Sequence, residues 1–119
     1  MRASLAQGGA EGIFVADEVE QVVNLKVIVE LAEKYRLPAI YPDRIFVELG
    51  GMISFGPDTA NAGRDCARLV AEIFKGANPA GILISQPTKY ELSLNLKTGK
   101  ALGIEISPLL LVQADTVIE

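Results

Sequence analysis

Histidine is absent from this chain, and cysteine occurs once, as Cys66. Histidine is the side chain that most often changes charge near neutral pH, and it is the commonest metal ligand. A single cysteine cannot form an intrachain disulfide or a cysteine-cluster zinc site. Cys66 has no histidine to activate it and falls on the apolar stripe of an expected helix, so we predict a packed thiol. These absences predict no metal, no cofactor and no catalytic residue.

Positive charge and aromatic residues are scarce as well. The net charge is −4, the basic residues form no run, and aromatic residues make up 6% of the chain. A nucleic-acid-binding surface needs clustered positive charge, so we predict no nucleic-acid partner. The lysines near the C-terminus, Lys89, Lys97 and Lys100, are expected to be solvated.

Long apolar runs are also missing. No run approaches the ~20 residues of a membrane-spanning helix. Residues 1–12 include one arginine but no continuous apolar region, so we predict no signal peptide. As written, the chain is expected to stay in the cytoplasm.

The apolar residues that are present follow a clear pattern. Half of the 119 residues are hydrophobic, enough for one small domain with a core. Short apolar runs, typical of buried strands, alternate with segments in which apolar residues recur every three or four positions, typical of helices. This alternation predicts an α/β fold with a mainly parallel sheet flanked by helices. We expect strands at residues 12–16, 38–41, 52–55 and 89–96, and helices at residues 18–35, 43–49, 57–75, 96–102 and 107–115.

Acidic or aromatic residues follow the first three expected strands. Open α/β sheets bind ligands at the carboxyl ends of their strands, and parallel strands share that edge. Carboxylates beside aromatic faces suit an amino group on an apolar body. The helix that begins near Pro57 offers free backbone N–H groups to a ligand carboxylate. We therefore predict that the chain binds an amino acid or a similar zwitterion. The candidate contacts are Asp17, Glu18, Tyr41, Asp43, Phe55, Gly56 and Asp58.

Most of these candidates also have a purely structural interpretation. A carboxylate directly before a helix can simply cap it, an aromatic ring can simply pack, and a glycine can serve only a turn. These alternatives apply to Asp17 and Asp58, to Tyr41 and Phe55, and to Gly56, respectively.

Two stretches of the sequence resemble one known family. They are "RLPAIYPDRIFVELGGMISFGPD" and "QPTKYELSLNLKTGKALGIEISPLLLVQADTVIE". Their shared features are "LPAIY", a Gly-Gly before a strand that ends in an aromatic-Gly pair, "QPTKYEL" and the closing "ADTVIE". The family is the substrate-binding proteins of ABC transporters, in the group related to tryptophan- and tyrosine-binding members. The resemblance runs from around Gly12 to the end of the sequence.

The resemblance implies a type I periplasmic-binding fold, in which two α/β lobes close around a small-molecule solute without catalysis. Residues 1–54 and 88–119 would form the second lobe, and residues 55–87 would cross to the first lobe. Family contacts would lie at the acidic position that matches Glu18, at the turn after Tyr41, and at a hinge formed by Phe55 and Gly56. The resemblance also implies a periplasmic or extracytoplasmic parent protein that works with an ABC permease.

The resemblance covers only the C-terminal half of a family member. Without a first lobe, the helix expected at residues 57–75 would expose its apolar stripe, and exposed apolar patches favour association. We therefore predict a homo-oligomer, with this helix exchanged between chains as one arrangement. The apolar stripe consists of Leu69, Val70, Ile73 and Phe74.

Two other functions stay open at this point. One is a truncated α/β domain that folds and self-associates but binds no solute. The other is an α/β enzyme that uses Asp17, Asp43 or Asp58 as an acid-base group, although the sequence shows no nucleophile–base pair.

Overall fold

The computed structural model of the chain describes residues 8–119 and divides into two compact units. Unit 1 is Met1–Gly56 together with Glu91–Glu119, and unit 2 is Pro57–Tyr90. The expected boundaries, after residues 54 and 87, lie within a few residues of these. The assignment of the units to two lobes stays a prediction. The N-terminal stretch in which we expect no signal peptide lies partly outside the described residues.

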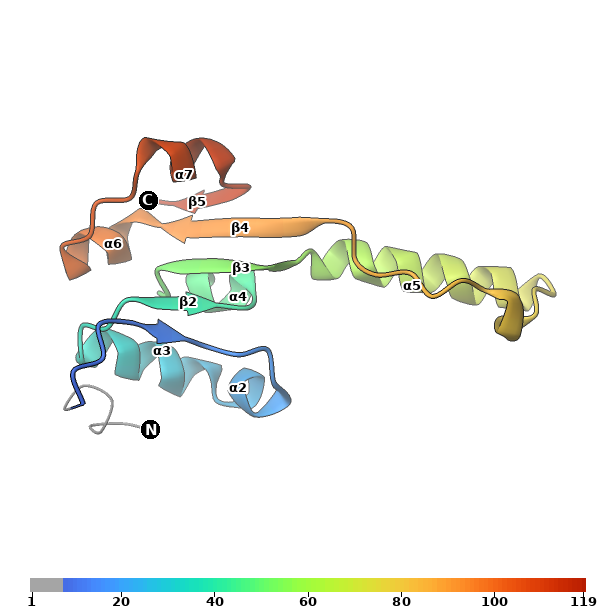
Figure 1. Cartoon of the computed structure of the whole chain (residues 1–119), viewed down its shortest axis with the longest axis horizontal. Coiled ribbons are helices and arrows are strands. Elements are labelled where there is room, and N and C mark those ends of the chain that lie inside the picture. Colours follow the sequence, from blue (N-terminus) through green and yellow to red (C-terminus); the bar gives the residue numbers. More distant parts are fainter. Residues whose placement is uncertain (1–7) are drawn as a thin grey trace. The chain divides into compact units, whose positions relative to one another are not determined.

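A five-stranded sheet forms the centre of unit 1, in the order β1-β2-β3-β4-β5. β2 pairs in parallel with β1 and with β3, and β4 pairs in parallel with β5. Figure 1 shows that β4 runs opposite to β3. The predicted α/β fold with a mainly parallel sheet is therefore confirmed. The strands are β1 (Ile13–Phe14), β2 (Ala39–Tyr41), β3 (Ile53–Pro57), β4 (Tyr90–Asn95) and β5 (Thr116–Ile118).

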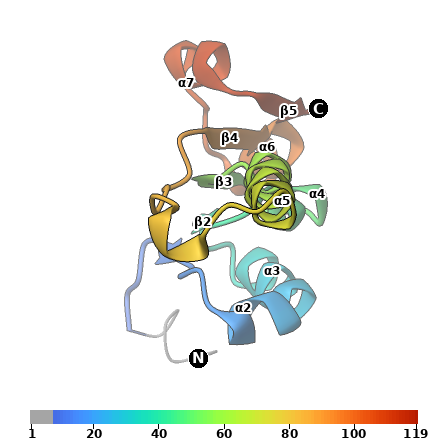
Figure 2. The same ribbon diagram turned by 90° about the vertical axis from the view of Figure 1, so that its right-hand side faces the viewer.

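The helices of unit 1 lie on both sides of this sheet. Figure 2 shows α3, α4 and α6 on one side and α7 on the other side, near β5. The core lies under α3 and α4, where side chains of both helices pack against β2. The helices are α2 (Val19–Val23), α3 (Leu25–Lys34), α4 (Arg44–Glu48), α6 (Leu96–Leu102) and α7 (Pro108–Gln113).

The least exposed side chains of the core come from β2, α4 and β4. The rings of Tyr41 and Phe46 are stacked, with their centroids 5.0 Å apart. Gly51 leaves room for this stack, because a Cβ atom there would lie 2.6 Å from the Tyr41 ring. Phe46 and Leu94 are fully buried. Burial of aromatic and aliphatic side chains of this size supplies the main free energy that holds unit 1 together.

Two elements differ from the sequence-based expectation. The helix expected at residues 18–35 is split into α2 and α3 at Asn24, whose Nδ2 donates a hydrogen bond to the Glu20 backbone oxygen at 2.8 Å. Asparagine competes in this way with the helical backbone pattern, and this explains the break. The expected strands did not include β5, which is too short to show an alternating pattern. Its register comes from pairing with residues 93–95 of β4.

Unit 2 consists mainly of one long helix and an extended return segment. The helix α5 (Thr59–Phe74) begins at the N-cap Asp58, and a short 3-10 turn, η1 (Pro79–Gly81), follows it. None of the described residues of α5 is buried. Cys66 is exposed, so the prediction of a packed thiol is wrong for this chain taken alone. Among residues 8–119, no helix has the length and apolar character needed to cross a membrane.

Replacing Phe46 should strongly destabilise unit 1. Phe46→Ala removes a fully buried ring and its stack with Tyr41, so we expect a loss of about 3–5 kcal/mol of unfolding free energy. Ile45→Ala is the matched control, because Ile45 is the preceding residue of α4 and is 44% exposed. Urea denaturation measures both. Equal losses for the two variants would contradict this description of the core.

Candidate functional site

The carboxyl ends of β1, β2 and β3 meet at one edge of unit 1, because these three strands are parallel. Backbone hydrogen bonds fix their alignment: the Val15 amide donates to the Ile40 oxygen at 3.0 Å, just beyond β1. Six of the seven predicted contacts belong to unit 1 and follow or end these strands. They are Asp17, Glu18, Tyr41, Asp43, Phe55 and Gly56; the seventh, Asp58, belongs to unit 2.

Two adjacent carboxylates, Asp17 and Glu18, occupy the turn between β1 and α2, and both are exposed. The expected capping role of Asp17 is wrong, because Glu18 is the N-cap residue of α2. The Glu18 side chain makes no capping hydrogen bond within the part of the chain that the structure describes. Both carboxylates are therefore placed to interact with a cation at the carboxyl end of β1.

Tyr41 lies in the core instead of at the rim. Its side chain is 2% exposed, and burial raises the pKa of its hydroxyl to about 12. A ring stacked on Phe46 and covered by α3 has little surface left for a ligand. This placement favours the packing interpretation of Tyr41 over a ligand contact.

Asp43 is held at the carboxyl end of β2 by its role as N-cap of α4. Its Oδ1 accepts a hydrogen bond from the Ile45 amide at 2.9 Å. The next residue, Arg44, forms ion pairs with Glu48 at 2.7 Å and with Glu91 at 3.3 Å. These contacts raise the pKa of the Arg44 guanidinium, through hydrogen bonds to Glu48 and Glu91.

Sequence reasoning missed this pair of Arg44 and Glu91. Glu91 also accepts a hydrogen bond from the Thr116 hydroxyl at 3.1 Å, so one carboxylate joins α4, β4 and β5. Arg44 carries a weak signal, as a cation directly after a predicted contact. Glu91 carries none, because 47 residues separate it from Arg44 and only the antiparallel return of β4 brings them together.

Gly56 is required by a close approach between two backbone segments. A Cβ atom at Gly56 would lie 1.8 Å from the carbonyl oxygen of Pro42, in the turn after β2. The backbone of Gly56 does not adopt the left-handed conformation that favours glycine. The structure therefore explains this glycine by contact with the neighbouring turn. The preceding residue, Phe55, presents a ring that is 55% exposed.

Asp58 lies in unit 2, where it begins α5. Its Oδ1 accepts a hydrogen bond from the Asn61 amide at 2.9 Å, and its Oδ2 forms an ion pair with Lys89 at 3.2 Å. The hydrogen bond from the Asn61 amide, followed by the Lys89 contact, lowers the pKa of this carboxyl. Lys89 is exposed, as expected, and it also forms this ion pair, because residues 57–58 and 89 run side by side, with the Asp58 amide bonded to the Lys89 oxygen at 3.0 Å.

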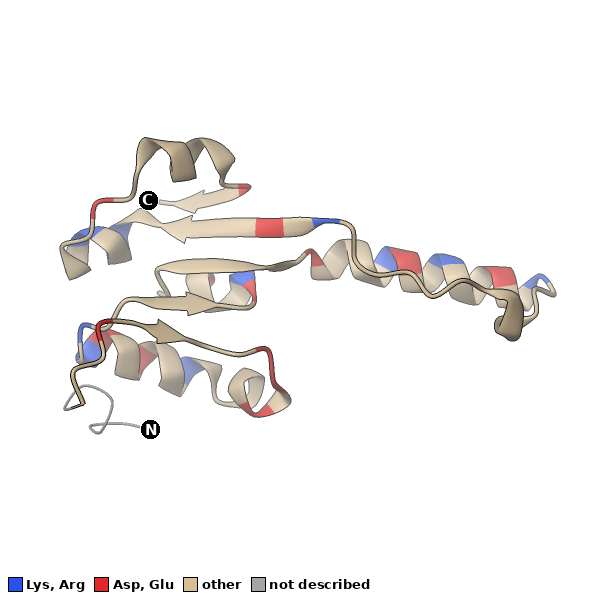
Figure 3. Ribbon diagram, in the orientation of Figure 1, with Lys and Arg blue, Asp and Glu red and all other residues tan. Residues whose placement is uncertain are grey.

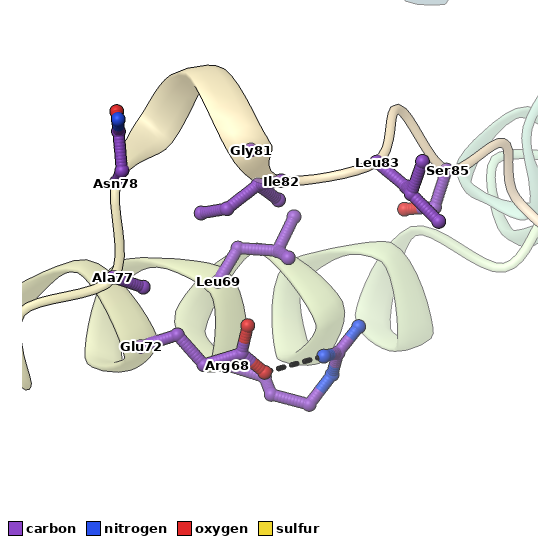
Figure 4. Close-up of a pocket in the computed structure, with 9 residues that line it drawn as sticks. All are labelled: Arg68, Leu69, Glu72, Ala77, Asn78, Gly81, Ile82, Leu83 and Ser85. Carbon is purple, nitrogen blue, oxygen red and sulfur yellow. Dashed lines mark hydrogen bonds and ion pairs between the residues drawn. The ribbon is translucent and has the colours of Figure 1, made fainter.

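Two hollows, one in each unit, lie away from the predicted contacts. In unit 2, a hollow of about 590 Å³ lies between α5 and the return segment, where Leu69 points toward Ile82 (Figure 4). In unit 1, a hollow of about 630 Å³ lies beside Arg36 and Lys97, at the carboxyl end of β4. The described residues contain no cluster of three or more acidic or cysteine side chains that could hold a metal ion.

Comparisons with known proteins support the fold and define the family. The profile of the ABC transporter substrate binding protein family matches residues 2–118. A conserved domain protein from Vibrio cholerae has a TM-score of 0.85 at 20% identity. The ABC domain in complex with L-Trp from Streptococcus pneumonia has a TM-score of 0.84 at 22% identity. No curated protein sequence matches at a significant level.

A third solved structure is more distant. It is the ligand-free, open structure of CD0873, a substrate-binding protein with adhesive properties from Clostridium difficile, with a TM-score of 0.62 at 16% identity. All three comparisons cover 98% of this chain, but only 41–42% of the solved chains. The chain therefore spans less than half the length of the structures that it matches.

The mainly parallel sheet and its match to solved structures define an α/β domain with a periplasmic-binding-protein-like fold. The family profile extends over nearly the whole sequence. The chain belongs to the ABC transporter substrate-binding protein family.

Adding a methyl group at Gly56 should disturb the predicted site. Because the Cβ atom of Gly56→Ala would collide with the Pro42 carbonyl, we expect a loss of about 1–3 kcal/mol of unfolding free energy. Gly63→Ala is the matched control: no described atom lies within 4 Å of a Cβ there, and alanine stabilises a helix interior by roughly 0.5–1 kcal/mol. Denaturant unfolding measures the unfolding free energy of both variants. A Gly56→Ala variant with an unchanged unfolding free energy would show that the close approach does not require glycine.

The lowered pKa of the Asp58 carboxyl predicts that the stability of unit 2 depends on pH. A carboxyl whose folded pKa is below its unfolded pKa stabilises the fold above the unfolded value, and this contribution is lost as pH falls through the folded pKa. Asp58→Asn can keep the helix cap but loses the ion pair with Lys89. We expect Asp58→Asn to be less helical than the original chain at neutral pH and equal to it in acid, by circular dichroism. A difference that persists in acid would contradict this assignment.

Proposed function

We propose that unit 1 supplies one side of a binding site for a small, amino-acid-like solute, in a protein that delivers this solute to an ABC permease. The observation that carries this proposal is the shared carboxyl edge of β1, β2 and β3, in a chain that belongs to a substrate-binding family. Ligands of open α/β sheets bind at such an edge.

The chemistry of this edge suits an ammonium group beside an apolar body. Asp17 and Glu18 are exposed at the end of β1 and provide negative charge. Asp43 adds a third carboxylate, held in place by its hydrogen bond from the Ile45 amide. The half-exposed ring of Phe55 offers an apolar surface. A carboxylate and an aromatic face are the groups that recognise the ammonium group and the apolar side chain of an amino acid.

The Gly56 contact contributes to the proposed site by positioning Phe55. Because Gly56 lies directly against the Pro42 carbonyl, the end of β3 is held close to the turn that precedes Asp43. We propose that Gly56, at the boundary with unit 2, is also the point at which the chain leaves the second lobe.

Tryptophan is the first solute to test. One of the solved structures, at 22% identity, is in complex with L-Trp, and an aromatic amino acid has the ammonium group and apolar body that this edge suits. We propose no catalytic step, because family members bind and deliver a solute. We propose that the full-length parent works outside the cytoplasm, as the family does.

A second candidate is a domain that self-associates without binding a solute. It is favoured by one observation: α5 has no buried residue, so its apolar side chains are open to association.

Calorimetric titration with tryptophan, tyrosine, phenylalanine and the branched amino acids tests both candidates. We expect weak binding to the 119-residue chain, with a dissociation constant well above micromolar, because unit 1 supplies only one side of the proposed site. Replacing the carboxylate in Glu18→Gln should weaken the binding of L-Trp further. Glu20→Gln is the matched control, because Glu20 is the second residue of α2 and is also exposed, and it should not weaken binding.

Three outcomes would contradict these expectations. Micromolar affinity would show that one side of the site is sufficient. Equal effects of Glu18→Gln and Glu20→Gln would remove the proposed role of the carboxylate at the end of β1. The absence of binding for every amino acid tested would favour the second candidate.

A further inference from the structure

One face of the sheet in unit 1 carries a continuous apolar row. Phe14 is paired with Ile40, and Ile40 with Ile53, so these side chains point to the same side of the sheet; Phe55 follows two residues later on that side. The opposite side is the one that packs under α3 and α4, through Ala39 and Tyr41. We call Phe14, Ile40, Ile53 and Phe55 the apolar row.

This side of the sheet has little helical cover within unit 1. Among the described helices of unit 1, Figure 2 shows α7 on this side, and α7 lies near β5, at the far end of the strand order from β1. Phe14 is accordingly 76% exposed. Parallel strands are normally covered on both faces, so the apolar row has the character of a surface that another layer covers.

The same chain contains a helix with an exposed apolar stripe. Cys66, Val70, Ile73 and Phe74 recur at the spacing that places residues on one face of a helix. All four are exposed, and Phe74 is 87% exposed. Leu69, which was expected in the exposed stripe, is half-buried instead, because it points toward Ile82 of the return segment (Figure 4). We therefore use the name α5 stripe for the four exposed residues only.

Neither the charge nor the length of the two surfaces opposes a contact between them. Figure 3 shows no charged residue on β1, β2 or β3, whereas charges of both signs alternate along α5. Arg68 and Glu72 form an ion pair with each other at 2.7 Å, so these two charged side chains beside the stripe need no partner on the sheet. The 16 residues of α5 extend about 24 Å, enough to cross three strands that span roughly 10 Å. A helix on a sheet is the usual layer arrangement of α/β proteins.

We propose that two copies of this chain form a closed dimer in which the α5 stripe of each copy packs on the apolar row of the other. The exchange is reciprocal, so each dimer contains two identical helix-on-sheet contacts and leaves neither surface exposed. This assembly does not depend on the solute, and its test does not use one.

The chain contains its own reporter for this contact, because Cys66 is its single cysteine and lies within the stripe. Light scattering should give a mass of two chains that dissociates on dilution. A maleimide should modify Cys66 slowly at concentrations where the dimer forms and rapidly after dilution. A monomer at all accessible concentrations would overturn the proposal, as would a mass that grows beyond two chains.

Charged substitutions identify the two surfaces. Phe14→Asp and Phe74→Asp each place a charge in an apolar contact, so each should raise the dissociation constant about tenfold or more. Val112→Asp on α7 is the matched control, because Val112 is 85% exposed and lies on neither surface; it should leave the dimer unchanged. Circular dichroism checks that each variant is folded. Sensitivity at only one of the two surfaces would overturn the pairing.

Mixing the two variants tests the pairing itself. A Phe14→Asp chain keeps an intact α5, and a Phe74→Asp chain keeps an intact apolar row. A mixed dimer therefore regains one of the two contacts, and we expect it to form at concentrations where each variant alone is monomeric. Contacts of helix with helix, or of sheet with sheet, would give no such rescue. Failure of the mixture to associate would overturn the reciprocal exchange.

Discussion

The parallel alignment of β1, β2 and β3 is the constraint on which the rest of unit 1 depends. Backbone hydrogen bonds from Ile13 to Pro38, at 2.8 Å, and from Val15 to Ile40, at 3.0 Å, fix the register between the first two strands. This register places alternate residues of each strand under α3 and α4. It also brings the turn after β1, the turn after β2 and the end of β3 to one edge, where the proposed solute site lies.

The same alignment gives the sheet two different faces. On one face, Tyr41 and Phe46 stack in a closed core, and Gly51 is small enough to allow that stack. On the other face, Phe14 is largely exposed, whereas Ile40 and Ile53 of the same row are half-buried. Solute binding and association therefore use adjoining parts of one sheet, its carboxyl edge and its other face, and Phe55 belongs to both. A substitution at Phe14 can change assembly without touching the carboxylates of the proposed site.

Features encoded by local periodicity could be predicted from the sequence. Apolar runs and helical spacing identified the α/β fold, the first four strands and α5, and the acidic residues after the strands marked the shared edge. Contacts between distant residues could not be predicted. The pairing of Arg44 with Glu91 depends on the return of β4, and the need for Gly56 depends on the nearby Pro42 carbonyl. The burial of Tyr41 was one of two open alternatives, which only the packing of α3 and α4 distinguishes.

The proposed solute site at the carboxyl edge of β1–β3 is tested most directly by mapping the binding position of L-Trp with NMR. Backbone amide shifts of this chain would be followed while L-Trp is added in excess, which reveals weak binding as well. We expect the largest changes at Asp17, Glu18, Asp43, Phe55 and Gly56. Changes confined to the hollow beside Arg36 and Lys97, at the opposite edge of the sheet, would contradict this site.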